Sequence, residues 1–139
     1  MTEYISEIKK IPHTDEDVFR VLSDLRNLDQ VGDLLPADKI SDFTFDADTV
    51  SFRVDPVGKV TFHVVEREPN KLVKFKSEKL PFDIFLWVQL VGKPESDTHL
   101  RVTVKADLNP FIKGMVDKPM REVVEKLSDA LTRLPYDRL

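Results

Sequence analysis

Hydrophobic and polar residues alternate along most of the chain between residues 43 and 107. A period of two is typical of antiparallel strands that have one buried face and one face in water. The segment 82–91 departs from this pattern because both parities are apolar, so its second face is either covered or forms a surface patch. The pattern predicts six strands, near residues 43–46, 50–55, 60–64, 73–76, 82–91 and 100–107.

The N-terminal segment predicts one more strand, followed by two short helices. Residues 3–11 form the strand, and Thr14 is a candidate helix N-cap because three acidic residues follow it, where they suit the helix dipole. The first helix has an apolar face from Val18 to Leu25, and the second is expected at about 26–31.

A long helix is predicted at the C-terminal end of the sequence. Asn109 and Pro110 suit its N-cap and first helical position. Pro119 lies inside the pattern and is expected to bend or loosen the helix. Its apolar stripe comprises Ile112, Met115 or Val116, Met120, Val123, Leu127, Leu131 and Leu134. Grouped strands with segregated helices indicate an α+β fold, and 139 residues fit a single domain, 1–139.

Composition narrows the possible functions. The 21 basic and 25 acidic residues give a net charge of −4, which disfavours general nucleic-acid binding. The absence of Cys excludes disulfides, thiolate metal sites and cysteine nucleophiles, and four Gly form no phosphate-binding loop. The longest apolar run, Ile84 to Val88, is far shorter than the ~20 residues of a membrane helix, and the acidic N-terminal residues do not predict a signal peptide. We therefore expect a cytoplasmic domain without an integral membrane segment.

Candidate metal ligands do not converge in the sequence pattern. His63 and Glu66 are three residues apart on a strand and should point to opposite faces unless a bulge intervenes. Asp42, Asp46 and Asp48 surround a tight turn, which explains them better than a calcium loop does. We predict no metal site and no cofactor.

The inward parity of the strands offers almost no catalytic chemistry. Ser77 is one of its few polar positions, and Glu66, at a strand end, is the only weak candidate for an acid or base. Strand-end carboxylates usually reach water. Lys74 and Lys76 share the solvent parity, where they form a solvated face or attract an anionic partner.

Two segments resemble the START-like, or SRPBCC, superfamily: the opening EYISEIKKIPHTDEDVFRVLSD and the closing LNPFIKGMVDKPMREVVEKLSDAL. With the order of elements between them, the resemblance covers essentially the whole chain. It implies a helix-grip fold, in which a curved seven-stranded antiparallel sheet grips the long C-terminal helix and encloses a cavity. Members of the superfamily range over lipid and sterol carriers, hormone receptors, polyketide cyclases and chaperone activators, and the fold does not choose among them.

The leading hypothesis is non-catalytic binding, or transport, of a small apolar ligand such as a lipid, sterol or polyketide-like molecule. The residues expected to line the cavity are Phe43, Phe45, Phe52, Val54, Phe62, Val64, Phe75, Ser77, Leu86, Val102, Val104, Met115 and Met120. One alternative is a protein-interaction module resembling the chaperone activators, which exposed area at Phe85 and Trp87 would favour. The other is a cyclase- or hydrolase-like enzyme that uses Glu66 or Asp residues near the cavity mouth, although the Phe-rich inner parity disfavours catalysis.

An entrance to the cavity is expected at one end of the sheet. Alternate connections of an antiparallel meander share an end, which groups the turns at 56–58 and 80–82 with the junction at 109–111. Apolar residues occupy these connections where polar ones are usual: Val57, Leu80 and Phe111. They form either a portal or a cap on the core, and Gly114 and Pro119 would allow the first helical turns to move as a lid.

Overall fold

The computed structural model describes residues 2–27, 40–54, 58–80, 82–93 and 97–137, without the side chains of Ile40 and Val54. Its strands are β1 (Thr2–Ile5), β2 (Lys9–Ile11), β3 (Ile40–Phe45), β4 (Thr49–Val54), β5 (Gly58–Glu68), β6 (Leu72–Glu78), β7 (Ile84–Gly92) and β8 (Thr98–Ala106). Its helices are α1 (Asp15–Leu22) and α2 (Pro110–Thr132). The predicted α+β class is confirmed.

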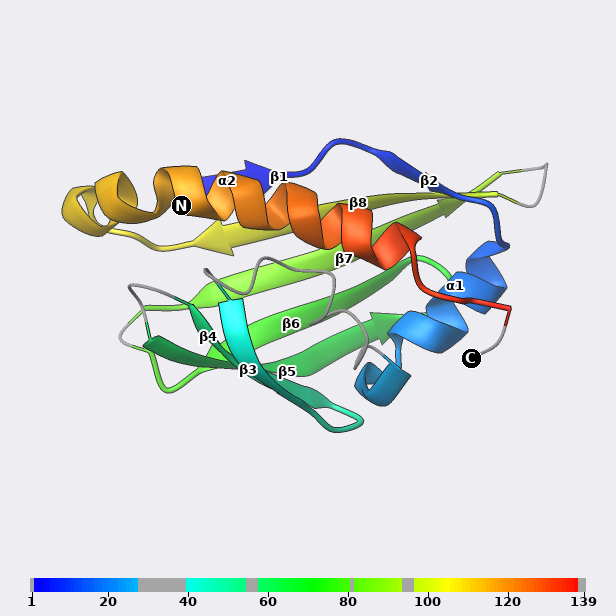
Figure 1. Cartoon of the computed structure of the whole chain (residues 1–139), viewed down its shortest axis with the longest axis horizontal. Coiled ribbons are helices and arrows are strands. Elements are labelled where there is room, and N and C mark those ends of the chain that lie inside the picture. The colour runs from blue at the N-terminus through cyan, green and yellow to red at the C-terminus, as the bar shows by residue number, and fades with distance from the viewer. Residues whose placement is uncertain (1, 28–39, 55–57, 81, 94–96, 138–139) are drawn as a thin grey trace.

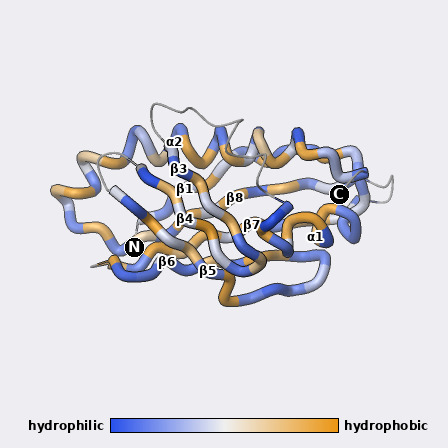
Figure 2. Tube along the Cα trace, turned by 60° about the horizontal axis from the view of Figure 1, so that its bottom comes forward, coloured by the Kyte–Doolittle hydropathy of each residue, from blue (hydrophilic) through white to orange (hydrophobic). Residues whose placement is uncertain are grey.

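The strands form one antiparallel sheet with the order β1-β8-β7-β6-β5-β4-β3, and β2 also pairs with β8. Because β1 and β2 lie end to end, the sheet has the seven strand positions expected of a helix grip. Helix α2 runs along the β1 and β8 side of one face, which we call the inner face (Figure 1). Hydrophobic and hydrophilic positions alternate along the strands, as Figure 2 shows.

Both predicted N-caps are present. The Thr14 hydroxyl accepts a hydrogen bond from the Asp17 amide at 3.2 Å, and the Asn109 side chain accepts one from the Ile112 amide at 2.9 Å. Helix α2 continues through Pro119. The second short helix is reduced to a 3₁₀ turn at 25–27 in the described part, and the remainder of its predicted range lies outside the described residues.

The first strand is interrupted at Ser6, which the alternation did not indicate. Register places Ile5 opposite Thr103 but Lys9 opposite Leu100, so the N-terminal segment has one residue more than β8 between these pairs. The buried Ser6 hydroxyl accepts a hydrogen bond from the Val102 amide at 3.0 Å, in place of a main-chain carbonyl. This substitution lets the chain bulge without leaving the Val102 amide unpaired.

A bulge in β5 overturns the placement of Glu66 on the inner parity. Val64 is paired with Phe75 but Glu66 with Lys74, so Val65 is an extra residue and is 45% exposed. The extra residue turns Glu66 to the outer face, where it is exposed. Glu66 therefore cannot serve as an acid or base in the cavity.

The same bulge brings His63 and Glu66 to one face, contrary to the expectation from their spacing. His63 nevertheless approaches a different carboxylate, since its Nδ1 lies 2.9 Å from Glu78 Oε1 across the β5–β6 pair. At the other predicted acidic cluster, Asp46 accepts hydrogen bonds from the amides of Asp48 and Thr49. A hydrogen bond from the Thr49 side chain, together with these two amides, lowers the pKa of the Asp46 carboxyl group. Asp46 thus acts as a turn residue.

Candidate functional site

The inner face of the sheet has two unlike halves. Helix α2 packs on β8, β1 and β2, and the core beneath it is fully buried, with Val102 and Leu100 at 0% exposure. The half formed by β3, β4 and β5 instead carries a chain of stacked Phe rings. Their centroids are 5.7 Å apart for Phe43 and Phe45, 5.4 Å for Phe43 and Phe52, and 5.9 Å for Phe52 and Phe62.

Most residues predicted to line the cavity lie on this inner face, at two levels of burial. The buried residues are Phe62, Phe75, Ser77, Val102 and Val104. Partly buried and packed against them are Phe43, Phe45, Phe52, Val64, Leu86 and Met120. The first group belongs to the buried core, and the second packs against that core with part of its surface exposed.

On α2, Val116 and not Met115 turns inward. Val116 is 7% exposed, whereas Met115 is 48% exposed on the neighbouring face, so the placement of Met115 in the cavity is wrong. Further along the helix, Met120, Val123 and Leu127 are partly buried against the core. The apolar stripe of α2 that faces the sheet therefore includes Val116 and these three residues.

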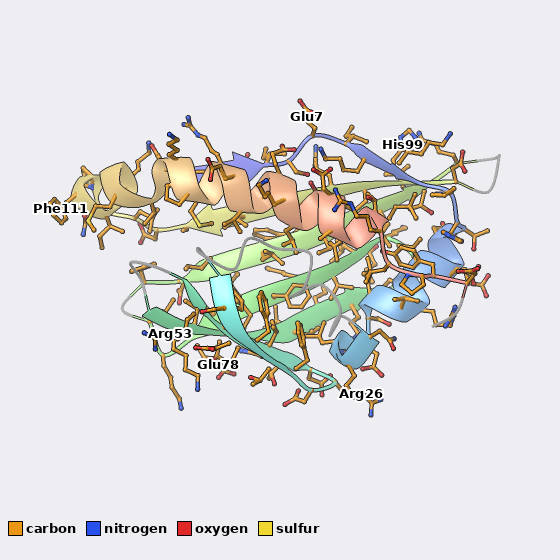
Figure 3. The ribbon with its side chains drawn as sticks, in the orientation of Figure 1. Glu7, Arg26, Arg53, Glu78, His99 and Phe111 are labelled. Atoms are coloured by element: carbon orange, nitrogen blue, oxygen red, sulfur yellow. The ribbon has the colours of Figure 1, made fainter. Side chains whose placement is uncertain are left out.

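The strand register confirms that three connections lie at the same end of the sheet, as predicted. Val54 pairs with Gly58 and Ile84 with Ala106, which places the β4–β5 turn, the β6–β7 turn and the junction before α2 together. Leu80 is partly buried against the core, whereas Phe111 is 78% exposed at the tip of α2 (Figure 3). Val57 lies outside the described residues.

A pocket of about 350 Å³ opens at this end, lined by Phe82, Asp107, Leu108, Asn109 and Ile112. Phe82 was predicted in the turn at 80–82 and Ile112 in the apolar stripe of the long helix, and neither was assigned to a pocket. Apolar residues at Leu108 and Phe82, in connections where polar residues are usual, are the signal that could have found the pocket.

A group of linked polar side chains between β1 and α2 was also not predicted from the sequence. The Tyr4 phenol, on a buried side chain, donates a hydrogen bond of 2.5 Å to Asp117 Oδ1, and Lys113 Nζ lies 3.0 Å from Asp117 Oδ2. Burial and the hydrogen bond to Asp117 raise the pKa of Tyr4 to about 12. At neutral pH the phenol therefore remains a donor that ties β1 to α2, and it is a poor general base.

The described residues contain no group of three side chains suited to hold a metal ion. Ser77 also places a buried hydroxyl on the inner face, and this hydroxyl accepts a hydrogen bond from the Ile84 amide at 2.9 Å. The Phe-rich half of the inner face presents apolar surface, whereas the pocket at the end of the sheet is lined by Asp107 and Asn109 as well as by apolar side chains. Apolar surface with a few polar groups is the usual make-up of a site for a small hydrophobic molecule.

Solved structures with the same architecture are numerous. Norcoclaurine synthase from Thalictrum flavum, in complex with dopamine and hydroxybenzaldehyde, superposes with a TM-score of 0.68 at 12% identity, over 99% of this chain and 89% of that one. A START superfamily protein from Mycobacterium smegmatis gives a TM-score of 0.63 at 14% identity, over 95% and 96% of the two chains. The chain has the START-like helix-grip fold.

A protein from Deinococcus radiodurans has the highest identity of the three, 18%, with a TM-score of 0.59 over 99% of this chain and 97% of that chain. No protein-family model matches the sequence, and no curated protein matches it. At these identities the likeness defines the fold of the chain and leaves its activity open. Among the described residues, no helix is both long and apolar enough to cross a lipid bilayer.

Proposed function

We propose that the chain binds a small hydrophobic ligand between the sheet and α2, without catalysing a reaction. The observation that carries the proposal is the row of Phe rings on β3, β4 and β5, on the half of the inner face away from the strands that α2 contacts. Phe43, Phe45 and Phe52 in this row are partly exposed. Aromatic surface that stays partly exposed on the inner face is suited to take an apolar molecule out of water.

Two further features support a binding role. Glu66, the only acid or base candidate of the inner parity, is on the outer face, and Tyr4 is engaged by Asp117. Norcoclaurine synthase, a protein of the same fold, is known in complex with two small aromatic molecules. The proposed class of ligand is a lipid, a sterol or a polyketide-like molecule with a compact apolar body, because the Phe rings of the inner face offer apolar contact surface.

The entrance is proposed at the end that holds the pocket, with Leu80 and Phe111 at its rim and Val57 in the neighbouring connection. Phe111 is 78% exposed, which is unusual for a side chain that serves only to cap a core. An apolar rim lowers the cost of moving a hydrophobic ligand from solution into the space behind it.

Titration with a fluorescent fatty acid and a fluorescent sterol tests the proposal. Wild-type protein should bind one of them saturably, and Phe111→Asp and Leu80→Asp should weaken binding by about tenfold by placing a charge at the rim. Ile8→Asp is the matched control, because Ile8 is 64% exposed between β1 and β2, away from the pocket. Absence of binding by the wild type contradicts the function, and equal binding by folded rim variants contradicts only the entrance.

A further inference from the structure

The outer face of the sheet carries an aromatic and cationic cluster that ligand binding on the inner face does not use. Phe85 lies between Lys76 and Lys105 in the cross-strand register, and Trp87 lies between Lys74 and Thr103. The two rings are 5.9 Å apart. We call Lys74, Lys76, Phe85, Trp87 and Lys105 the outer patch. The outer patch accounts for the apolar residues at both parities of β7, because Phe85 and Trp87 are only partly buried on the outer face, while α1 approaches β7 at Gly92.

The three lysines lie over the rings. Lys74 Nζ is 5.0 Å from the centroid of Phe85 and 5.1 Å from that of Trp87. Lys76 Nζ is 5.7 Å from Phe85, and Lys105 Nζ is 5.5 Å from Trp87. At these distances the ring quadrupoles hold the ammonium groups close to the sheet. The apolar and the charged parts of the patch therefore form one surface.

One of these three charges is paired with a carboxylate, and the other two have no ion pair within the described part of the chain. Lys105 pairs with Glu3 at 3.1 Å. Among the described residues, Lys74 and Lys76 form no ion pair, although Glu66 is opposite Lys74 in the register. The chain as a whole is acidic, with a net charge of −4. The outer patch itself contains three lysines and no carboxylate, so it is a local positive region, with Glu66 and Glu78 next to it on the same face. Such a region attracts an anionic partner.

We propose that the outer patch binds an acidic, extended segment of a partner protein. Lys74 and Lys76 are alternate residues of β6 and project from the same face of the sheet. Alternate side chains of an extended segment also share a face, with the same spacing of about 6.5–7 Å. Carboxylates at every second position can thus meet both lysines, and apolar side chains of the segment can contact Phe85 and Trp87.

The patch fits a protein segment better than a membrane or a nucleic acid. Phe85 and Trp87 are both partly buried and lie against lysine ammonium groups, so they do not project as side chains that insert into a bilayer do. The ring faces on which bases would stack are approached by the same ammonium groups. Carboxylates need only reach those ammonium groups, which already lie at the surface.

Trp87 is the only Trp of the chain, so its fluorescence reports directly on the patch. The probe is a peptide in which Glu and Val alternate, titrated at low ionic strength, and a peptide in which Gln replaces Glu is the control. We expect saturable quenching or a shift of Trp87 emission with the Glu peptide only, weakened about tenfold by added salt.

Charge reversal then assigns the site, with calorimetry as a readout independent of Trp87. Lys74→Glu with Lys76→Glu should weaken binding of the Glu peptide at least about tenfold. The matched control, Lys118→Glu with Lys126→Glu, changes two exposed lysines of α2 and should leave it unchanged. The proposal would be overturned if the wild type does not bind the Glu peptide, or if both double variants lose binding equally. It would also be overturned if phosphatidylserine vesicles or single-stranded RNA bind more tightly than the peptide does.

Discussion

A pair of leucine truncations on α2 distinguishes a close-packed helix from one that borders a cavity. Leu131 is 2% exposed in the core, whereas Leu127, one turn earlier, is only partly buried. Leu→Ala removes three carbon groups at about 0.8 kcal/mol each, so the transfer term alone is roughly 2–3 kcal/mol at full burial. A cavity term adds to this only where neighbouring atoms surround the deleted group.

We therefore expect Leu131→Ala to lower the free energy of unfolding by about 3–5 kcal/mol, and Leu127→Ala by about 1–2 kcal/mol. Urea unfolding followed by circular dichroism measures both values, and Lys126→Ala, at an exposed position of the same helix, should stay within about 0.5 kcal/mol of the wild type. Equal losses for Leu127 and Leu131 would refute the reasoning, because Leu127 would then be as tightly packed as the core and would border no open space.

Three further outcomes are expected. Burial raises the pKa of both tyrosines, with Tyr4 at about 12, so native protein should show no tyrosinate absorbance at about pH 10.5. The stability of the fold should fall as the pH rises from about 10 through 12, because the unfolded chain releases these protons first. Tyrosinate absorbance near pH 10 in folded protein would contradict this. Thr14→Ala and Asn109→Ala should each cost about 0.5–2 kcal/mol in urea unfolding, and a loss near zero would show that the caps contribute little. Met120→Trp should fill part of the inner space, keep the fold and weaken binding of the fluorescent ligand; unchanged binding would place the ligand elsewhere.

Local chemistry made the fold predictable from the sequence. Strand alternation and the residues that cap helices act over a few positions, so Thr14 and Asn109 could be recognised as helix starts. Bulges are different, because one extra residue depends on the partner strand. The alternation therefore predicted the wrong face for Glu66 and a single strand in place of β1 and β2. It could not show that the Ser6 hydroxyl replaces a main-chain acceptor between these two strands.

The candidate site was predictable only in part, for a related reason. Periodicity identified the inner parity, including Phe52 and Phe75, but it could not show which of these side chains are core and which border open space. The choice between Met115 and Val116 stayed open because both lie near the edge of the helical stripe. The Tyr4–Asp117 hydrogen bond joins residues far apart in the chain, and no local sequence pattern predicts such a contact.

Native mass spectrometry of freshly purified protein tests the central claim, that the space between the sheet and α2 holds a small hydrophobic molecule. The account predicts a complex heavier than the 16.0 kDa chain, either as purified or after incubation with a mixture of fatty acids and sterols, and loss of the added mass on denaturation. Phe111→Asp should carry less of the ligand than Ile8→Asp does. The bare chain mass under both conditions, from protein that is folded by circular dichroism, would contradict the account.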